Sequence, residues 1–435
     1  MEGPLAPVLY DTARAVPSWW EASAGPGPER PALTGEIRTE VAVIGSGYAG
    51  LSAARTLAER GIGVSVLDAG AIGWGSSGRN GGIVGYGGTK LSRATLIRQF
   101  GTEETGRSEA MLAEGIRDIR AFCESVGLAD AIQGTGEYTF AHGPRTARAQ
   151  AAESPPEGFT AEHVPPSGRA DIARFGGEWL SPAFGIHPLR YVKALAEAAE
   201  AAGALIHPRS AVTVWERAGN GHRLVSAAGA VRADRVLLAT NGFTPDGLHP
   251  QFTGRAVPVI SNIAVTRPLT EEEHATHPWL GPDPMCDTRH LLAYFRLLPD
   301  RRLLFGMRGD LRGSDTVAKR MHARLRRRLA SALPGCAGAE TDYFWRGPVC
   351  TTRSLRPSIG MLETEPTVFH AFGWHGSGIG MATLAGRLVG EAIAGDTPRI
   401  PTPWQGLPPR IPLPGLRPLY VGAMMAAYAL ADRQG

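Results

Sequence analysis

One stretch, residues 41–82, constrains the fold more than any other part of the chain. It begins with an apolar run at residues 41–44 and continues directly into Gly45-Ser46-Gly47-Tyr48-Ala49-Gly50. A helical pattern follows, and a second apolar run then ends at Asp68. This order of strand, glycine turn, helix and strand predicts the start of a parallel α/β sheet with a dinucleotide-binding turn.

Each residue type in this turn has a physical role. Gly45 permits the tight turn, Gly47 leaves space for a pyrophosphate, and Gly50 lets the helix pack closely on the strand. The helix N-terminus attracts phosphate, and Asp68 can accept hydrogen bonds from ribose hydroxyls. The alternative is a glycine-rich turn that binds no ligand. The residues expected at the cofactor are Gly45, Gly47, Tyr48, Ala49, Gly50, Asp68 and Ala69.

A second glycine-rich loop, GSSGRNGG at residues 75–82, follows the acid. With this loop the chain resembles the D-amino-acid-oxidase-like family of FAD-dependent oxidoreductases, which includes glycine and sarcosine oxidases. Residues 77–82, SGRNGG, are similar to those of γ-glutamylputrescine oxidase-like members. The family usually has Glu at the position of Asp68, but the shorter acid still reaches a ribose. The resemblance implies FAD contacts from Ser76, Ser77, Arg79, Asn80, Gly81 and Gly82.

Two later segments are similar to the parts of this family that return to FAD. The strand at residues 236–239 leads into Thr240 and Asn241, and Val212 lies on an earlier expected strand at residues 212–215. A strand at residues 368–372 leads into a last glycine loop and a helix, whose N-terminus the resemblance places at the flavin. Related oxidases carry serine before histidine in this loop, whereas here the two are exchanged. The loop residues expected at FAD are Gly373, Gly376, Ser377, Gly378 and Ile379.

The fold class that follows is α/β, with an FAD-binding Rossmann-like domain interleaved with a substrate domain on a largely antiparallel sheet. We expect the FAD domain at residues 36–90, 180–250 and 345–398, and the substrate or cap domain at 91–179 and 251–344. An arm at residues 1–35 should pack on the body through Trp19 and Trp20, and residues 399–435 should form a tail helix. Residues 141–167 are expected to be surface loop, and residues 290–298 and 302–308 a hairpin.

The candidate catalytic residues are Tyr294, Arg296 and His375. Tyr294 and Arg296 share a face of the expected hairpin because side chains alternate along a strand, and the resemblance places this sheet under the substrate. The alternative is an ordinary hairpin with a solvent-exposed arginine. Further side chains that could select the substrate are Arg79, Arg308 and Trp345.

The resemblance implies oxidation of a primary or secondary amine, either an amino acid or a polyamine derivative, to an imine that is then hydrolysed. Molecular oxygen or another acceptor would reoxidise the flavin. Some relatives hold a substrate carboxylate with a cation just after the last glycine loop, where this chain has Gly380, so a longer amine is favoured over a simple amino acid. The alternatives are an NAD-type dehydrogenase and a non-catalytic flavin-holding subunit of a larger complex.

Several family oxidases use a lysine near the flavin to activate oxygen. This chain has three lysines, Lys90, Lys193 and Lys319, and their positions in the sequence predict that none lies at the flavin. We therefore expect either modest oxidase activity or a dehydrogenase. We expect non-covalent FAD, with a thioether through Cys350 as the alternative, because a single cysteine more often packs than reacts.

Composition excludes few classes of function. The net charge is +4 with an isoelectric point near 9.0, and the arginine-rich helix expected at residues 316–333 is better explained as a solvated face than as a nucleic-acid site. The four cysteines lack metal-ligand spacing. The sequence shows no secretory signal and no apolar run of the ~18 residues that span a membrane. A cytoplasmic, metal-free enzyme without a transmembrane segment is the expectation.

Overall fold

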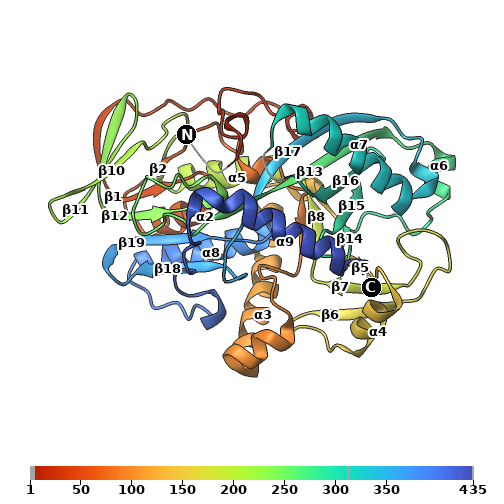
Figure 1. Cartoon of the computed structure of the whole chain (residues 1–435). Coiled ribbons are helices and arrows are strands. Elements are labelled where there is room, and N and C mark those ends of the chain that lie inside the picture. Colours follow the sequence, from red (N-terminus) through yellow and green to blue (C-terminus); the bar gives the residue numbers. More distant parts are fainter. Residues whose placement is uncertain (1–4, 311–312, 434–435) are drawn as a thin grey trace.

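The computed structural model describes residues 5–310 and 313–433. Its first large sheet contains the parallel strands that the glycine turn predicts (Figure 1). The strand order is β10-β11-β12-β1-β2-β9, with β19 on β12 and β18 on β19. Strands β19, β12, β1, β2 and β9 are parallel neighbours, whereas β10, β11 and β12 are antiparallel. The bounds are β1 Gly35–Ile44, β2 Val64–Leu67, β9 Leu205–His207, β10 Val214–Ala218, β11 Gly221–Val225, β12 Gly229–Leu238, β18 Ser358–Leu362 and β19 Glu365–Phe372.

The second large sheet has the order β17-β13-β16-β15-β14-β5-β7-β6. All its pairings are antiparallel except that of β14 with β5. Its strands are β5 Glu137–Phe140, β6 Thr160–Val164, β7 Gly177–Ser181, β13 Val257–Pro268, β14 Met285–Asp287, β15 Ala293–Leu297, β16 Arg302–Arg308 and β17 Thr341–Thr351. A small third sheet pairs β8 (Phe184–Ile186) with β3 (Ile83–Val84) and β4 (Ile132–Gln133).

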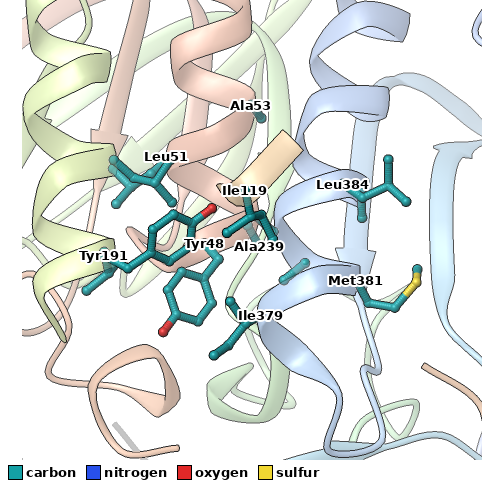
Figure 2. Close-up of a cluster of buried hydrophobic side chains, with 14 of the residues drawn as sticks. Tyr48, Leu51, Ala53, Ile119, Tyr191, Ala239, Ile379, Met381 and Leu384 are labelled. Carbon is teal, nitrogen blue, oxygen red and sulfur yellow. The ribbon is translucent and has the colours of Figure 1, made fainter. Parts of the chain in front are cut away.

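Helices cover the first sheet, and two of them pack unusually closely. Helix α2 (Tyr48–Ala58) contacts α8 (Gly378–Ile393) because α8 carries Gly386 and Gly390. A Cβ atom at Gly386 would overlap the carbonyl oxygen of Ala49, and one at Gly390 would lie 2.9 Å from Cβ of Thr56. Figure 2 shows the apolar cluster around these helices, with Tyr48, Leu51 and Leu384 among its labelled members. Burial of this cluster fixes the two helix N-termini relative to each other.

The remaining helices lie outside this pair. Their bounds are α1 Trp19–Ser23, α3 Arg93–Ser125, α4 Pro144–Ala152, α5 Pro188–Ala201, α6 Glu271–Ala275, α7 Asp315–Ala332 and α9 Arg417–Ala431. The backbone of α3 is interrupted at Gly101, whose φ of 84° is not helical. None of the helices within the described residues has the length and apolar character that a membrane span requires.

The expected α/β class with a largely antiparallel second sheet is confirmed, and so is the hairpin of β15 and β16. The expectation of a structureless loop at residues 141–167 is wrong, because α4 and β6 lie there. Strand β10 begins at Val214, so Val212 precedes the strand on which it was expected. Strand β17 belongs to the second sheet along its whole length, so the expected domain boundary at residue 345 would cut it. The division into domains otherwise stays a prediction.

Both ends of the described chain pack on the body. Trp20 is 1% exposed, and its indole N–H donates to the Asn80 carbonyl at 2.8 Å, which ties the arm to the second glycine loop. Helix α9 buries Val421 and is held by an ion pair between Arg417 and Asp246 at 2.6 Å. The expected packing of the arm and of the tail helix is therefore confirmed. Residues 1–4 of the expected arm and 434–435 of the expected tail lie outside the described residues.

Candidate active site

The first glycine turn connects β1 to α2 in the expected manner. Gly45 has a φ of 109°, a left-handed backbone conformation that favours glycine, and a Cβ atom there would lie 2.8 Å from the Ala239 carbonyl oxygen. A Cβ atom at Gly50 would overlap the carbonyl oxygen of Gly45. The turn therefore requires Gly45 for its path and Gly50 for the contact between helix and strand.

The N-terminus of α2 opens into a large cavity. Its N-cap residue is Gly47, which has no side chain to accept hydrogen bonds from the first backbone N–H groups of the helix. The positive end of the helix dipole therefore faces the cavity. The Tyr48 amide donates to the Ser77 hydroxyl at 3.3 Å. A Cβ atom at Gly47 would lie only 3.1 Å from that hydroxyl, so a larger side chain would fill the cradle. This geometry fits an anionic phosphate group.

Asp68 lies at the end of β2 and also lines this cavity. Its Oδ2 accepts hydrogen bonds from the Ser46 amide at 2.7 Å and the Ser46 hydroxyl at 2.8 Å, and its Oδ1 accepts one from the Gly70 amide at 2.8 Å. Burial raises the pKa of Asp68 above its usual value. A carboxylate oxygen can accept two hydrogen bonds, so Oδ1 keeps capacity for a ribose hydroxyl.

The second glycine loop closes the cradle, and Asn80 holds it together. The Asn80 amide nitrogen donates to the Ser76 and Ser77 carbonyls at 3.0 Å each, and its oxygen accepts the Gly82 amide at 2.8 Å. The Ser76 hydroxyl donates to the Pro348 carbonyl at 2.6 Å. These bonds join the loop to β17 of the second sheet, so the loop spans the boundary between the two sheets.

Most of the predicted cofactor residues meet at this first cavity. Those that line it are Gly45, Gly47, Tyr48, Ala49, Asp68, Ala69, Ser76, Ser77, Asn80, Val212, Thr240, Asn241, Gly376 and Gly378. Gly50, Gly82 and Gly373 shape the backbone without lining it; the Gly373 amide, for example, donates to Asn241 Oδ1 at 2.9 Å. Arg79, Gly81, Ser377 and Ile379 line a second cavity instead.

The second cavity adjoins the first. Both are lined by Ser76, Asn80, Pro348, Val349, Gly376 and Gly378, which we call the join. Helix α8 begins at Gly378, so its positive N-terminal end also lies at the join. A ligand that fills the first cavity can therefore present one end to the contents of the second.

Tyr294 is the one predicted catalytic side chain that lines the second cavity. It lies against Gly81, where a Cβ atom would be 2.8 Å from its ring, and its hydroxyl is 2.8 Å from that of Ser261. Burial raises the pKa of Tyr294 to about 12, so the phenol is neutral at physiological pH. It can contribute shape and a hydrogen bond, but not a charge.

The geometry does not support a substrate contact by Arg296. Its side chain is 1% exposed and lies behind the turn at Gly82 and Gly185, where it donates to the Ile186 carbonyl at 2.8 Å and faces the Trp20 ring at 5.4 Å. Burial lowers the pKa of Arg296 to about 9. The alternation of side chains along β15 predicts that Arg296 and Tyr294 share one face of the strand, but only Tyr294 lines the second cavity.

His375 likewise lines neither cavity and is fully buried. Its Nε2 lies 3.3 Å from the Thr352 hydroxyl, and burial lowers its pKa to about 3, so the ring is neutral. Its carbonyl oxygen accepts a hydrogen bond from Arg308 at 2.9 Å. The residue therefore positions Arg308, and the geometry gives its imidazole no access to a substrate.

Two acidic or basic side chains of the second cavity, Lys90 and Glu137, are not among the site residues predicted from the sequence. Lys90 lines this cavity, which corrects the expectation that no lysine lies near the flavin site, and the adjacent charge of Arg308 lowers the pKa of Lys90 to about 7. Glu137, from the first position of β5, lines it as well. No local motif marks either residue, because long-range folding brings them to the cavity.

Cys350 lines the first cavity on β17, but its thiol is poorly suited to attack a flavin. Burial raises its pKa to about 12, and the sulfur lies 3.6 Å from the Thr351 carbonyl oxygen. The thiolate is the nucleophilic form, and little of it exists at neutral pH.

We therefore expect acid precipitation of the purified protein to leave the flavin in the supernatant. Cys350→Ala should retain the flavin content of the parent protein, measured by absorbance of the released cofactor. A yellow pellet that loses its colour in Cys350→Ala would show a covalent link.

The parallel sheet, its phosphate-type turn and the adjoining second cavity are typical of dinucleotide-binding oxidoreductases. The chain belongs to the DAO family of FAD dependent oxidoreductases, whose sequence profile matches residues 40–392. The resemblance drawn from residues 75–82 is thus confirmed.

Individual relatives agree with this assignment. The chain is 31% identical over 434 residues to gamma-glutamylputrescine oxidoreductase of Escherichia coli strain K12, covering 96% of this chain and 98% of the relative. It is 30% identical to the probable oxidoreductase OrdL of Haemophilus influenzae, covering 85% and 86%. In fold it matches glycine oxidase of Geobacillus kaustophilus, with a TM-score of 0.64, 21% identity and coverage of 83% and 96%. It also matches L-proline dehydrogenase of P. horikoshii, with a TM-score of 0.65, 19% identity and coverage of 84% and 96%.

Proposed function

We propose that the protein oxidises a primary or secondary amine to an imine, which water then hydrolyses, with FAD as its cofactor. One observation carries the proposal: the nucleotide cradle opens, at the glycine-rich join, into a second cavity lined by ionisable side chains. The names of the relatives, gamma-glutamylputrescine oxidoreductase among them, support an amine or amino acid as substrate.

The residues present fit FAD. Gly47 and the N-terminus of α2 would hold the pyrophosphate, Asp68 the adenosine ribose, and Asn80 with the N-terminus of α8 the ring end. FAD, when bound, supplies the two-electron acceptor for the carbon–nitrogen bond. The binding is non-covalent, because burial raises the pKa of the Cys350 thiol to about 12 and the nucleophilic thiolate is scarce at neutral pH.

The side chains of the second cavity prepare the amine. A neutral nitrogen is needed for oxidation, and the charges of Arg308 and Lys90 oppose a protonated amine near the join. Arg308 is held beside Gly376 by its hydrogen bond to the His375 carbonyl at 2.9 Å. Tyr294 and Gly81 form part of the cavity wall and orient the substrate.

The alternatives are weaker. An NAD-type dehydrogenase disagrees with membership of the FAD-dependent family. A non-catalytic flavin-holding subunit would not need Lys90, Arg308 and Glu137 in a cavity next to the cofactor cradle. Molecular oxygen and another electron acceptor both stay candidates for reoxidation.

The proposal is tested by anaerobic mixing of the purified protein with a panel of amines and amino acids. At least one amine should bleach the flavin without added nicotinamide cofactor. Failure of every amine, together with reduction only by a nicotinamide nucleotide, would refute the proposal.

A further inference from the structure

Glu137 is a half-buried carboxylate in the wall of the second cavity. Its Oε1 accepts the Tyr86 amide hydrogen bond at 2.8 Å. Among the described residues no arginine, lysine or histidine forms an ion pair with it. Removal from bulk water raises the pKa of Glu137 to about 7, and Glu178 adds a smaller repulsion. A carboxylate held in this way gains stability from any cation that enters the cavity.

The surrounding backbone is built around this carboxylate. A side chain at Gly85 would overlap the Glu137 carboxylate, so the glycine leaves the space that Glu137 occupies. The next residue, Tyr86, is anchored through its hydroxyl, which lies 3.3 Å from a Glu109 oxygen. Glu109 is itself buried and ion-paired with Arg93 at 2.8 Å. Glu137 therefore has a fixed position in the cavity wall.

The second cavity also holds basic side chains, among them Lys90 and Arg308. Arg308 packs beside Gly376 at the join, and its charge is the main cause of the lowered pKa of Lys90. Neither cation forms an ion pair with Glu137 within the described chain. The neighbours of Glu137, namely Gly85, Tyr86 and Cys286, line the second cavity alone and are not part of the join. Arg308 and the N-terminus of α8 thus provide positive charge at the join, and the Glu137 carboxylate lies outside the join.

We propose that Glu137 binds a second, protonated amino group of the substrate, away from the nitrogen that is oxidised. The inference rests on the proposed amine oxidation and narrows the substrate class to amines that carry a second ammonium group. The reacting nitrogen must be neutral, which the charges of Arg308 and Lys90 favour, whereas the second nitrogen stays charged at neutral pH. A carboxylate whose charge no described basic residue balances provides the counter-charge that this second nitrogen requires.

The test compares matched probes on the flavin-loaded protein. The probes are linear α,ω-diamines of three to six carbons and the monoamines of equal length, and the proteins are the parent, Glu137→Gln and the control Glu162→Gln. Glu162 is an exposed carboxylate on β6 of the same sheet. Binding is measured by calorimetry, and anaerobic flavin reduction is measured separately. Loss of a charged partner in a cavity predicts a loss of diamine affinity of roughly 30-fold or more in Glu137→Gln.

The expected result is that the parent and Glu162→Gln bind at least one diamine more tightly than its monoamine, and that Glu137→Gln abolishes the difference. Equal affinity for both probes in the parent, or an unchanged preference in Glu137→Gln, overturns the inference. If amines reduce the flavin without this preference, the proposed function stands and the role of Glu137 falls. If diamines bind through Glu137 but no amine reduces the flavin, the binding role stands and the proposed function falls.

Discussion

Gly47→Val is expected to give a folded protein that retains almost no flavin and has no amine-oxidising activity. The N-terminus of α2 meets the first cavity at Gly47, where a Cβ atom would already lie 3.1 Å from the Ser77 hydroxyl. The two further carbons of valine would fill the space that a pyrophosphate needs. The Ser77 side chain can rotate away, so the fold should survive. Flavin content per protein and far-ultraviolet circular dichroism measure the two effects.

Substitutions at two other glycines serve as controls for Gly47→Val. Gly247 is exposed, and a Cβ atom there would have no neighbouring atom within 4 Å, so Gly247→Val should keep its flavin. Gly50→Ala should fail to fold, because its Cβ atom would overlap the backbone carbonyl of Gly45, which cannot rotate away. Normal flavin content in Gly47→Val would contradict the placement of the pyrophosphate.

Lys90→Met is expected to slow reoxidation of the reduced enzyme by oxygen by roughly 100-fold, a typical effect of removing one electrostatic donor from an active site. Lys90 is the lysine that lines the second cavity. Because the charge of Arg308 lowers the pKa of Lys90 to about 7, the ammonium form declines as the pH rises through that value. Reoxidation in the parent protein should therefore slow above about pH 7, and Lys90→Met should lack this dependence.

The measurement is stopped-flow mixing of amine-reduced enzyme with oxygen. The matched control is Lys319→Met, because Lys319 is exposed on α7 and lines neither cavity. An unchanged oxygen rate in Lys90→Met would show that the electrons leave by another route, and the dehydrogenase alternative would then be favoured.

The nucleotide cradle was predictable from sequence because its determinants are local. The turn is specified by the left-handed backbone of Gly45 and by the close contact of Gly50 with the Gly45 carbonyl, both within a few residues of the chain. The same holds for the start of α8 at Gly378, which follows a strand and a glycine loop. Short-range patterns of this kind leave a direct record in the sequence.

The substrate cavity was much less predictable. Strand alternation places Tyr294 and Arg296 on one face, but it carries no information about depth, and the turn at Gly82 separates Arg296 from the cavity. Glu137 reaches the cavity through the pairing of β5 with β14 and β7 in the second sheet, and Lys90 reaches it from the segment beyond β3. Pairings of this range depend on the whole fold, and single-sequence periodicity does not record them.

The prediction of secondary structure between residues 141 and 167 failed for a related reason. Helix α4 has no buried residue, so its sequence shows no apolar face, and its start depends on Gly143 and Pro144. Strand β6 is an edge strand with mostly exposed side chains, and it is stabilised by pairing with β7. Both elements derive their stability from backbone pairing and capping rather than from an apolar pattern.

The central claim is that FAD in the first cavity accepts two electrons from an amine in the second. The most direct measurement is an anaerobic titration of the purified protein with an amine selected by the screen, following flavin absorbance and quantifying the carbonyl product. The account predicts complete bleaching, with one carbonyl product formed for each FAD reduced, and no bleaching when the amine is replaced by the corresponding alcohol. A protein that contains FAD but is reduced by no amine, or that forms product without flavin reduction, would contradict it.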